Sequence, residues 1–230
     1  MAQFYQNEDR HFVSVDCIIL GFKGNAIYVL IIKRKFNPLK GERSLMGGFV
    51  KQGESVNDTV ARVVYEYTGI ENVYWEQVGA YGNVDRDIAG RVISIVYYAL
   101  IDMELFDETL MRKYDAEWVD INHVGTLILD HNQFLADTLR LMRRRTATRP
   151  VGFNLLPEKF TLPQLQSLYE AIYQTSLDKR NFRKKIFEMD ILEKLNEKDK
   201  NASKRGAYYY RFNKEKYDRR LEDGAVFSFI

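Results

Sequence analysis

The sequence predicts an α+β protein with two domains, residues 1–150 and residues 151–230. Three observations support this prediction. The first part has strand-like runs around a well-marked interior helix, which favours an α+β sandwich. The stretch TATRP, residues 146–150, then interrupts a helical pattern and ends in proline. The charge also changes there, because the first part holds 18 Lys and Arg against 20 Asp and Glu, whereas the second holds 16 against 12.

The composition is that of a soluble globular protein. The 230 residues are 46% hydrophobic and 29% charged. The longest apolar runs, such as residues 26–32, are far shorter than the roughly 20 residues of a membrane span, and the polar start MAQFYQNEDRHF is unlike a signal peptide. We therefore expect a cytoplasmic protein with no membrane partner. A single cysteine, Cys17, excludes an intramolecular disulfide and a cysteine-based zinc site.

The first part contains a predicted β-hairpin. β-branched residues are dense in VSVDCIILGF, residues 13–22, and in AIYVLIIKRK, residues 26–35, with the turn residues Lys-Gly-Asn between them. Two further strand-like runs, residues 71–83 and 91–101, flank a polar loop. A short strand is also predicted at residues 116–119.

Two helices are predicted among these strands. The first begins at Ser55 and ends at Gly69, which is placed as a C-terminal cap. Its buried stripe at helical spacing consists of Val56, Val60, Val63 and Tyr67. The second starts near Asp130, whose carboxylate is expected to cap it while Gln133 closes a capping box. Its buried stripe consists of Leu135, Leu139 and Met142, and it ends in Arg143, Arg144 and Arg145.

The order of elements after residue 150 is helix, turn, helix and hairpin. Thr161 and Gln164 form a capping box before a short helix. A second helix is predicted within residues 177–190, and its buried face consists of Phe182, Ile186 and Met189. Two strands, residues 191–195 and 207–212, are joined by a polar loop. This is the order of a winged helix-turn-helix.

Basic residues gather in the second helix and the hairpin, the elements with which a winged helix-turn-helix binds DNA. Residues 178–211 hold eleven Lys and Arg against six Asp and Glu. A recognition helix enters the major groove, where Arg addresses guanine and Asn adenine, and wing lysines contact phosphate. The predicted DNA-binding residues are Lys179, Arg180, Asn181, Arg183, Lys184, Lys204 and Arg205. The alternating Tyr208, Tyr210 and Phe212 are expected in the core of the wing. A solvated charged face, or an RNA-binding or protein-docking module, is the alternative.

The stretch GGFVKQGESVNDTVARVVYEYTGI, residues 47–70, carries a different signal. It resembles the Nudix box, whose spacing is matched by Gly48, Glu54, Arg62, Gly69 and Ile70. The resemblance implies a loop-helix-loop whose glutamates hold a divalent metal against a diphosphate. The consensus around its arginine is Arg-Glu-aliphatic-any-Glu-Glu. Here two of the three helix carboxylates are replaced, by Val63 and Tyr67.

The loss of two carboxylates reduces the ability of this motif to bind a divalent metal ion. Hard divalent cations bind several carboxylate oxygens, and diphosphate hydrolysis needs that metal. With Glu66 and Glu54 left, we expect a protein that is not an enzyme and holds neither metal nor cofactor. The spacing of Asp58, Arg62 and Glu66 also fits a simple ion-paired helix face. The main rival is a hydrolase of a nucleoside diphosphate derivative such as ADP-ribose, which would recruit Asp85, Asp87 or Glu66.

A degenerate Nudix domain followed by a winged helix resembles the Nudix-related bacterial transcription regulators. GFNLLPEKFTLPQLQSLYEAIY and DKRNFRKK are similar to the DNA-binding half of that family. The resemblance implies a homodimeric regulator, such as a repressor, that binds a palindromic operator and responds to a small molecule in the Nudix domain. One branch responds to ADP-ribose, and another responds to sugars such as L-arabinose and controls carbohydrate metabolism. The missing carboxylates favour the sugar branch.

The effector site is predicted beside the Nudix helix and the loop at residues 85–87. Its predicted polar residues are Arg34, Arg62, Glu66, Asp85, Arg86 and Arg91. The alternative for each arginine is a structural ion pair.

Overall fold

The computed structural model describes residues 7–106, 108–200 and 206–229. The strands are β1 (Phe12–Lys23), β2 (Ala26–Lys33), β3 (Arg43–Ser44), β4 (Met46–Phe49), β5 (Tyr74–Tyr81), β6 (Val92–Ile101), β7 (Ala116–Asp120), β8 (Phe160–Thr161), β9 (Leu192–Asp199) and β10 (Ala207–Phe212). The helices are α1 (Val56–Thr68), α2 (Glu108–Tyr114), α3 (His131–Thr148), α4 (Leu162–Tyr173), α5 (Lys179–Glu188) and α6 (Lys214–Glu222), with short 3-10 helices η1 (Met103–Leu105) and η2 (Pro150–Leu155). Each predicted strand and helix corresponds to one of these elements.

Strand β1 organises the larger sheet. Seven of the described strands form one mixed sheet with the order β3-β2-β1-β6-β5, in which β4 pairs with β1 and β7 pairs with β2. Parallel pairing with β6 runs from Phe12 to Gly21 of β1. On its other edge β1 pairs antiparallel with β4 over residues 14–17 and with β2 over residues 20–23. Residues 14–17 are therefore held between two neighbouring strands.

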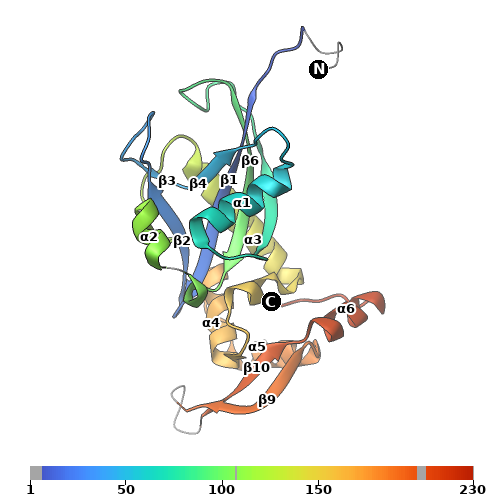
Figure 1. Ribbon diagram of the computed structural model, residues 1–230. Coiled ribbons are helices and arrows are strands. Elements are labelled where there is room, and N and C mark those ends of the chain that lie inside the picture. Colours follow the sequence, from blue (N-terminus) through green and yellow to red (C-terminus); the bar gives the residue numbers. More distant parts are fainter. Residues whose placement is uncertain (1–6, 107, 201–205, 230) are drawn as a thin grey trace.

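The two faces of this sheet carry different helices. Cys17 and Ile19 pack in one apolar cluster with Val63 of α1. Ile18 and Leu20 point the other way, because side chains alternate along a strand, and join a cluster with Phe134 of α3. Figure 1 shows α1 and α3 on opposite sides of the sheet. This arrangement confirms the predicted α+β class with a Nudix-like α/β/α sandwich.

The ends of the two main helices differ from each other. Ser55 and Asp58 form a capping box at the start of α1, and Gly69 ends it with a φ of 72°, as predicted. Asp130 stands at the N-cap of α3, but its side chain makes no capping bond. The predicted capping role of Asp130 is wrong because its carboxylate binds Arg86 instead. The helix also continues into the predicted break and ends at Thr148. Thr146 is buried there, and its hydroxyl donates to the Met142 carbonyl.

Several short elements had no signal in the sequence. The unpredicted strands β3, β4 and β8 have two to four residues each, too few for a periodic pattern. Helix α2 has seven residues. Helix α6 has no fully buried residue, so its apolar stripe is weak.

The second part confirms the winged helix-turn-helix order. The helices α4 and α5 are followed by the hairpin of β9 and β10 (Figure 1). The short strand β8, which precedes α4, pairs with β10 and completes a sheet with the order β8-β10-β9. Tyr210 is buried and Phe212 stacks on Phe153, as expected for the core of the wing. Tyr208 differs, because it is 39% exposed. Tyr208 lies near the tip of the hairpin, on the far side of a register shift between Tyr208 and Tyr210.

One apolar cluster joins the two parts. It extends from Ile18 in the sheet through Phe153 of η2 to Phe229 near the end of the described chain. The backbone N–H of Phe229 also donates to the Ala147 carbonyl of α3 at 2.9 Å. Because the core is continuous, the two parts are expected to unfold together. None of the helices in the described ranges has the length and apolar character needed to cross a membrane.

The shared core gives a stability prediction. Replacing Phe153 with alanine removes ring contacts to Phe160, Phe212 and Phe229, so we expect a loss of about 3–5 kcal/mol in unfolding free energy, in one transition. Denaturant unfolding followed by circular dichroism measures it. The control is Val226→Ala, because that side chain is 93% exposed and should change stability by less than about 0.5 kcal/mol. Two separate transitions, one of them unchanged, would contradict a shared core.

Candidate functional site

A cavity of about 330 Å³ lies between the sheet and the start of α3. This volume is at the low end of the roughly 300–1,000 Å³ of small-molecule sites. Its walls come from β1, β4, the loop at residues 34–39, the loop at residues 86–89 and the residues around the N-terminus of α3. The charged residues that line it are Asp16, Arg34, Arg86 and Asp87, so their charges balance.

Asp16 forms the floor of the cavity. It is 8% exposed and lies on the α3 face of β1, between β4 and β6. Its Oδ2 accepts a hydrogen bond from Ser94 Oγ of β6 and a longer one, at 3.4 Å, from Ser14 Oγ. A Cβ at Gly47 would lie 2.5 Å from Asp16 Oδ1, so this glycine leaves room for the carboxylate.

His131 faces this carboxylate from the first turn of α3. It is 4% exposed, and its Nδ1 accepts the backbone N–H of Leu45 at 3.1 Å. Nδ1 is therefore unprotonated, and the ring proton of the neutral imidazole lies on Nε2. Burial lowers the pKa of His131, against the opposite effect of Asp16. Nε2 lies 3.8 Å from Asp16 Oδ1, too far for a direct hydrogen bond.

The rim of the cavity is aromatic and cationic. The Arg34 guanidinium lies 4.2 Å from the centroid of the exposed Phe36 ring, and its Nε donates to the Pro38 carbonyl at 3.1 Å. Tyr67, from the last turns of α1, lines the same cavity and packs on Tyr114 with centroids 4.5 Å apart. Burial raises the pKa of Tyr67 to about 12. The residue that replaces a Nudix carboxylate thus supplies a neutral aromatic wall.

Arg86 connects the cavity to the N-terminus of α3. Its side chain is 3% exposed and binds both oxygens of Asp130 at 2.9 and 2.8 Å. The guanidinium also lies 5.3 Å from the centroid of Phe134 in the same helix. Arg86 is therefore already neutralised by a bidentate carboxylate, although it lines the cavity.

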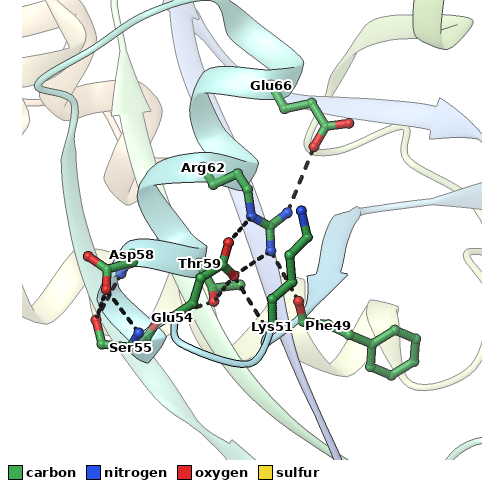
Figure 2. Close-up of polar contacts among 8 residues, drawn as sticks. All are labelled: Phe49, Lys51, Glu54, Ser55, Asp58, Thr59, Arg62 and Glu66. Carbon is green, nitrogen blue, oxygen red and sulfur yellow. Dashed lines mark hydrogen bonds and ion pairs between the residues drawn. The ribbon is translucent and has the colours of Figure 1, made fainter.

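The surviving residues of the Nudix box form an ion-pair cluster of their own (Figure 2). Arg62 binds both oxygens of Glu54, at 2.7 and 2.9 Å, and donates to the Phe49 carbonyl at 3.1 Å. Glu66 lies 3.9 Å from the same guanidinium. The hydrogen bonds from Arg62 lower the pKa of Glu54 from 4.5 to about 2. Asp58 is outside this cluster because it caps α1 with Ser55.

This arrangement does not fit the divalent metal of Nudix hydrolases. Of the three helix positions that carry carboxylates in that family, only Glu66 is kept, and the other two are Val63 and Tyr67. Glu54, before the helix, is held by Arg62, and Glu66 lies 3.9 Å from the same guanidinium. Among residues 7–106, 108–200 and 206–229, no group of three His, Cys, Asp or Glu is placed to bind a metal ion.

The structure places only some of the predicted effector residues in the cavity. Arg34 and Arg86 line the cavity, whereas Arg62 and Glu66 lie in the adjacent ion-pair cluster. Asp85 is exposed. The Arg91 guanidinium donates hydrogen bonds to the carbonyls of Gly82 and Asn83 and so stabilises its own loop. The sequence prediction missed Asp16, Ser14, Tyr67 and His131. Asp16 offered one signal, since it is the lone charge in the strand-like run VSVDCIILGF.

Helix α5 presents its polar residues to solvent. Lys179, Arg180, Asn181, Arg183 and Lys184 are all exposed, while Phe182 and Ile186 face the core. Asp178 caps the helix through the backbone N–H of Asn181 at 2.8 Å. Lys184 is 3.8 Å from Glu188, an exposed pair that water screens. The predicted wing residues Lys204 and Arg205 lie outside the described residues.

The strands β9 and β10 present a basic surface next to this helix, with Tyr208 at its centre. The ammonium groups of Lys194 and Lys198 lie 3.6 and 4.5 Å from the centroid of its ring. Two residues further along β10, Tyr210 packs on Phe187 of α5. A basic helix and a basic hairpin thus lie side by side, the arrangement with which winged helices meet duplex DNA.

Comparisons with known proteins agree with both parts of this geometry. A family model for the NUDIX domain matches residues 10–142, and one for the NrtR DNA-binding winged helix domain matches residues 152–212. An ADPR-responsive transcriptional repressor, NtrR, from Acinetobacter baylyi is 32% identical over 220 residues, 93% of this chain and 88% of that protein. An ADP-ribose pyrophosphatase from Methanocaldococcus jannaschii is 39% identical over 131 residues, 56% of this chain and 73% of that enzyme.

Solved structures extend the similarity to the whole fold. Shewanella oneidensis NrtR in complex with a 27mer DNA matches with a TM-score of 0.82 and 25% identity, over 94% of this chain and 97% of that one. A MutT/nudix family protein from Enterococcus faecalis shares the fold, with a TM-score of 0.74 and 22% identity over 91% of this chain and 90% of that one.

The fold and the site define a Nudix-type ligand-binding domain joined to a winged helix-turn-helix, and the chain belongs to the Nudix family. Within it, the full-length similarity to the repressor and the match to the winged helix of NrtR make it a member of the NrtR-like transcriptional repressors.

The ion-pair cluster gives a prediction about protonation. In Arg62→Gln the pKa of Glu54 should rise from about 2 toward its ordinary 4.5, because the hydrogen bonds that hold it down are lost. The contribution of this pair to stability is complete above pH 4.5 and disappears as the pH falls toward 2. Carboxyl chemical shifts followed by NMR across this range measure the change. An unchanged Glu54 pKa in the variant would contradict the assigned cause.

Proposed function

We propose that the chain is a transcriptional repressor that binds operator DNA through α5 and the β9–β10 hairpin and is regulated by a small molecule in the cavity. The observation that carries the proposal is the position of α3. Its N-terminus carries His131 and follows Asp130, the partner of Arg86, so that end forms part of the cavity. Its C-terminal half contacts the winged helix.

The contacts at that far end are specific. Arg143 Nε donates to the Ile172 carbonyl at the end of α4 at 2.8 Å. The hydroxyl of Tyr173 lies 3.0 Å from Thr146 Oγ1 and donates to the Arg143 carbonyl. A helix of 18 residues with both ends engaged can transmit a displacement. A ligand regulates operator binding through such an element if it binds the two states of the protein with different affinity.

The relatives support ADP-ribose as the effector. The Acinetobacter repressor is named for its response to ADPR, and the archaeal relative is an ADP-ribose pyrophosphatase. This favours the ADP-ribose branch over the sugar branch that the missing carboxylates favoured.

One observation favours a neutral sugar as the second candidate. Of the two arginines that line the cavity, Arg86 is already bound by Asp130, and Asp16 places a negative charge at the floor. A diphosphate gains little in such a site, whereas an uncharged sugar such as L-arabinose avoids the repulsion.

The same proposal includes the absence of hydrolysis. Glu54 and Glu66 are both committed to Arg62, and neutral Tyr67 lines the cavity in place of a carboxylate. A homodimer on a palindromic operator, with the effector-binding part ending near residue 150, completes the proposal.

Operator binding is predicted to depend on the exposed face of α5. Arg183→Ala should weaken binding to the upstream promoter by about 1–3 kcal/mol if Arg183 addresses a base. Fluorescence anisotropy with labelled promoter DNA measures it. The matched control is Lys51→Ala, which removes one positive charge from the Nudix part. Equal affinity of wild type and Arg183→Ala would remove this residue from the interface.

Effector control is predicted for the same complex. Addition of ADP-ribose should lower operator affinity, and a parallel titration with L-arabinose tests the second candidate. If neither compound changes operator affinity, the proposed regulation fails.

Hydrolysis is predicted to be absent. We expect no magnesium-dependent turnover of ADP-ribose, as measured by release of AMP. Turnover that disappears in Glu66→Gln would establish the rival hydrolase and contradict the proposal.

A further inference from the structure

The floor of the cavity contains a donor and an acceptor that face each other without a bond. His131 Nε2 carries the ring proton, because Nδ1 accepts the N–H of Leu45. Asp16 Oδ2 accepts from Ser94 and Ser14, so Oδ1 is the oxygen that faces the histidine. Both residues are more than nine-tenths buried, yet the two atoms are 3.8 Å apart. Buried polar groups normally have a partner within hydrogen-bond distance.

A ligand atom in the cavity beside the two groups can bond to both of them, and its chemistry is restricted. It has to accept a hydrogen bond from Nε2–H and donate one to Oδ1. A hydroxyl does both, as does water. An ammonium group has no acceptor lone pair, and an ionised phosphate has no donor and is repelled by the carboxylate. The pair thus favours a hydroxyl oxygen, from the ligand or from water.

The surroundings also favour an uncharged, hydroxyl-bearing ring. Ser14 and Ser44 line the same cavity; their hydroxyls donate to Asp16 Oδ2 and to the Leu45 carbonyl, and their oxygens can accept from a ligand hydroxyl. The charges of the lining residues balance, and the faces of Phe36 and Tyr67 provide apolar surface for the ring carbons. Gly47 leaves the space that the Asp16 carboxylate fills, since a Cβ there would lie 2.5 Å from Oδ1.

We propose that Asp16 and His131 form a hydroxyl-recognition pair that selects a sugar ring at the floor of the cavity, where a ligand hydroxyl takes the place of a bridging water. The inference rests on the proposed function, because it assigns the part of the effector that this site binds. A free pentose and a ribose of ADP-ribose both carry ring hydroxyl groups, and either can supply the hydroxyl that binds Asp16 and His131.

The test uses two substitutions at His131 in the full-length chain. His131→Asn places an amide oxygen near the position of Nδ1, so the bond from Leu45 is kept and the Nε2 donor is lost. His131→Gln places an amide near the position of Nε2, so the donor is kept. Isothermal titration calorimetry with L-arabinose and with ADP-ribose measures ligand binding. Operator affinity without ligand and the melting temperature verify that each variant is folded.

We expect His131→Asn to bind the ligand about 10-fold to 100-fold more weakly than wild type, because the ligand hydroxyl loses its donor. His131→Gln should retain most of the affinity. The ligand that shows this pattern, L-arabinose or ADP-ribose, identifies the source of the hydroxyl.

Two results would overturn the inference in different ways. If wild type binds one of the ligands and folded His131→Asn binds it equally well, the pair does not recognise the hydroxyl, and the proposed function stands. If wild type binds neither ligand, the inference and the proposed effector classes fail together.

Discussion

The buried carboxylate of Asp16 is the constraint on which the site depends. It lies in the middle of the sheet because β1 pairs with β4 on one edge and with β6 on the other. A buried charge needs hydrogen-bond partners, and Ser94 and Ser14 supply them from the same face. Gly47 leaves the space that the carboxylate fills. The packing of the sheet therefore creates the polar floor, and α3 closes it with His131.

The altered Nudix box has a different arrangement of charges from that of a metal-dependent hydrolase. In a hydrolase the helix carboxylates gather around a metal ion. Here Arg62 neutralises Glu54 and lies close to Glu66, while Tyr67 extends into the cavity wall. The motif keeps the loop and the helix in place through its caps and its ion pair. The cavity that we propose as the ligand site lies mainly on the opposite face of the sheet, where α3 runs from it to the winged helix.

Local patterns in the sequence predicted most of the fold. Periodicity and caps located α1 between Ser55 and Gly69, and the basic helix with its hairpin predicted the winged helix. The site was less predictable because its residues are distant in sequence. Asp16 and His131 meet only through strand pairing and helix packing, and Arg86 reaches Asp130 across 44 positions. A sequence pattern assigns Asp130 to its own helix end, since the competing partner is invisible until the fold is known.

If occupancy of the cavity and operator binding are coupled in this protein, each ligand must change the affinity for the other by the same factor. The measurement is the dissociation constant of the effector, ADP-ribose or L-arabinose, for the full-length chain with and without saturating operator DNA. We expect operator DNA to weaken effector binding by the same factor by which the effector weakens operator binding. Equal effector affinity in the two conditions would contradict it.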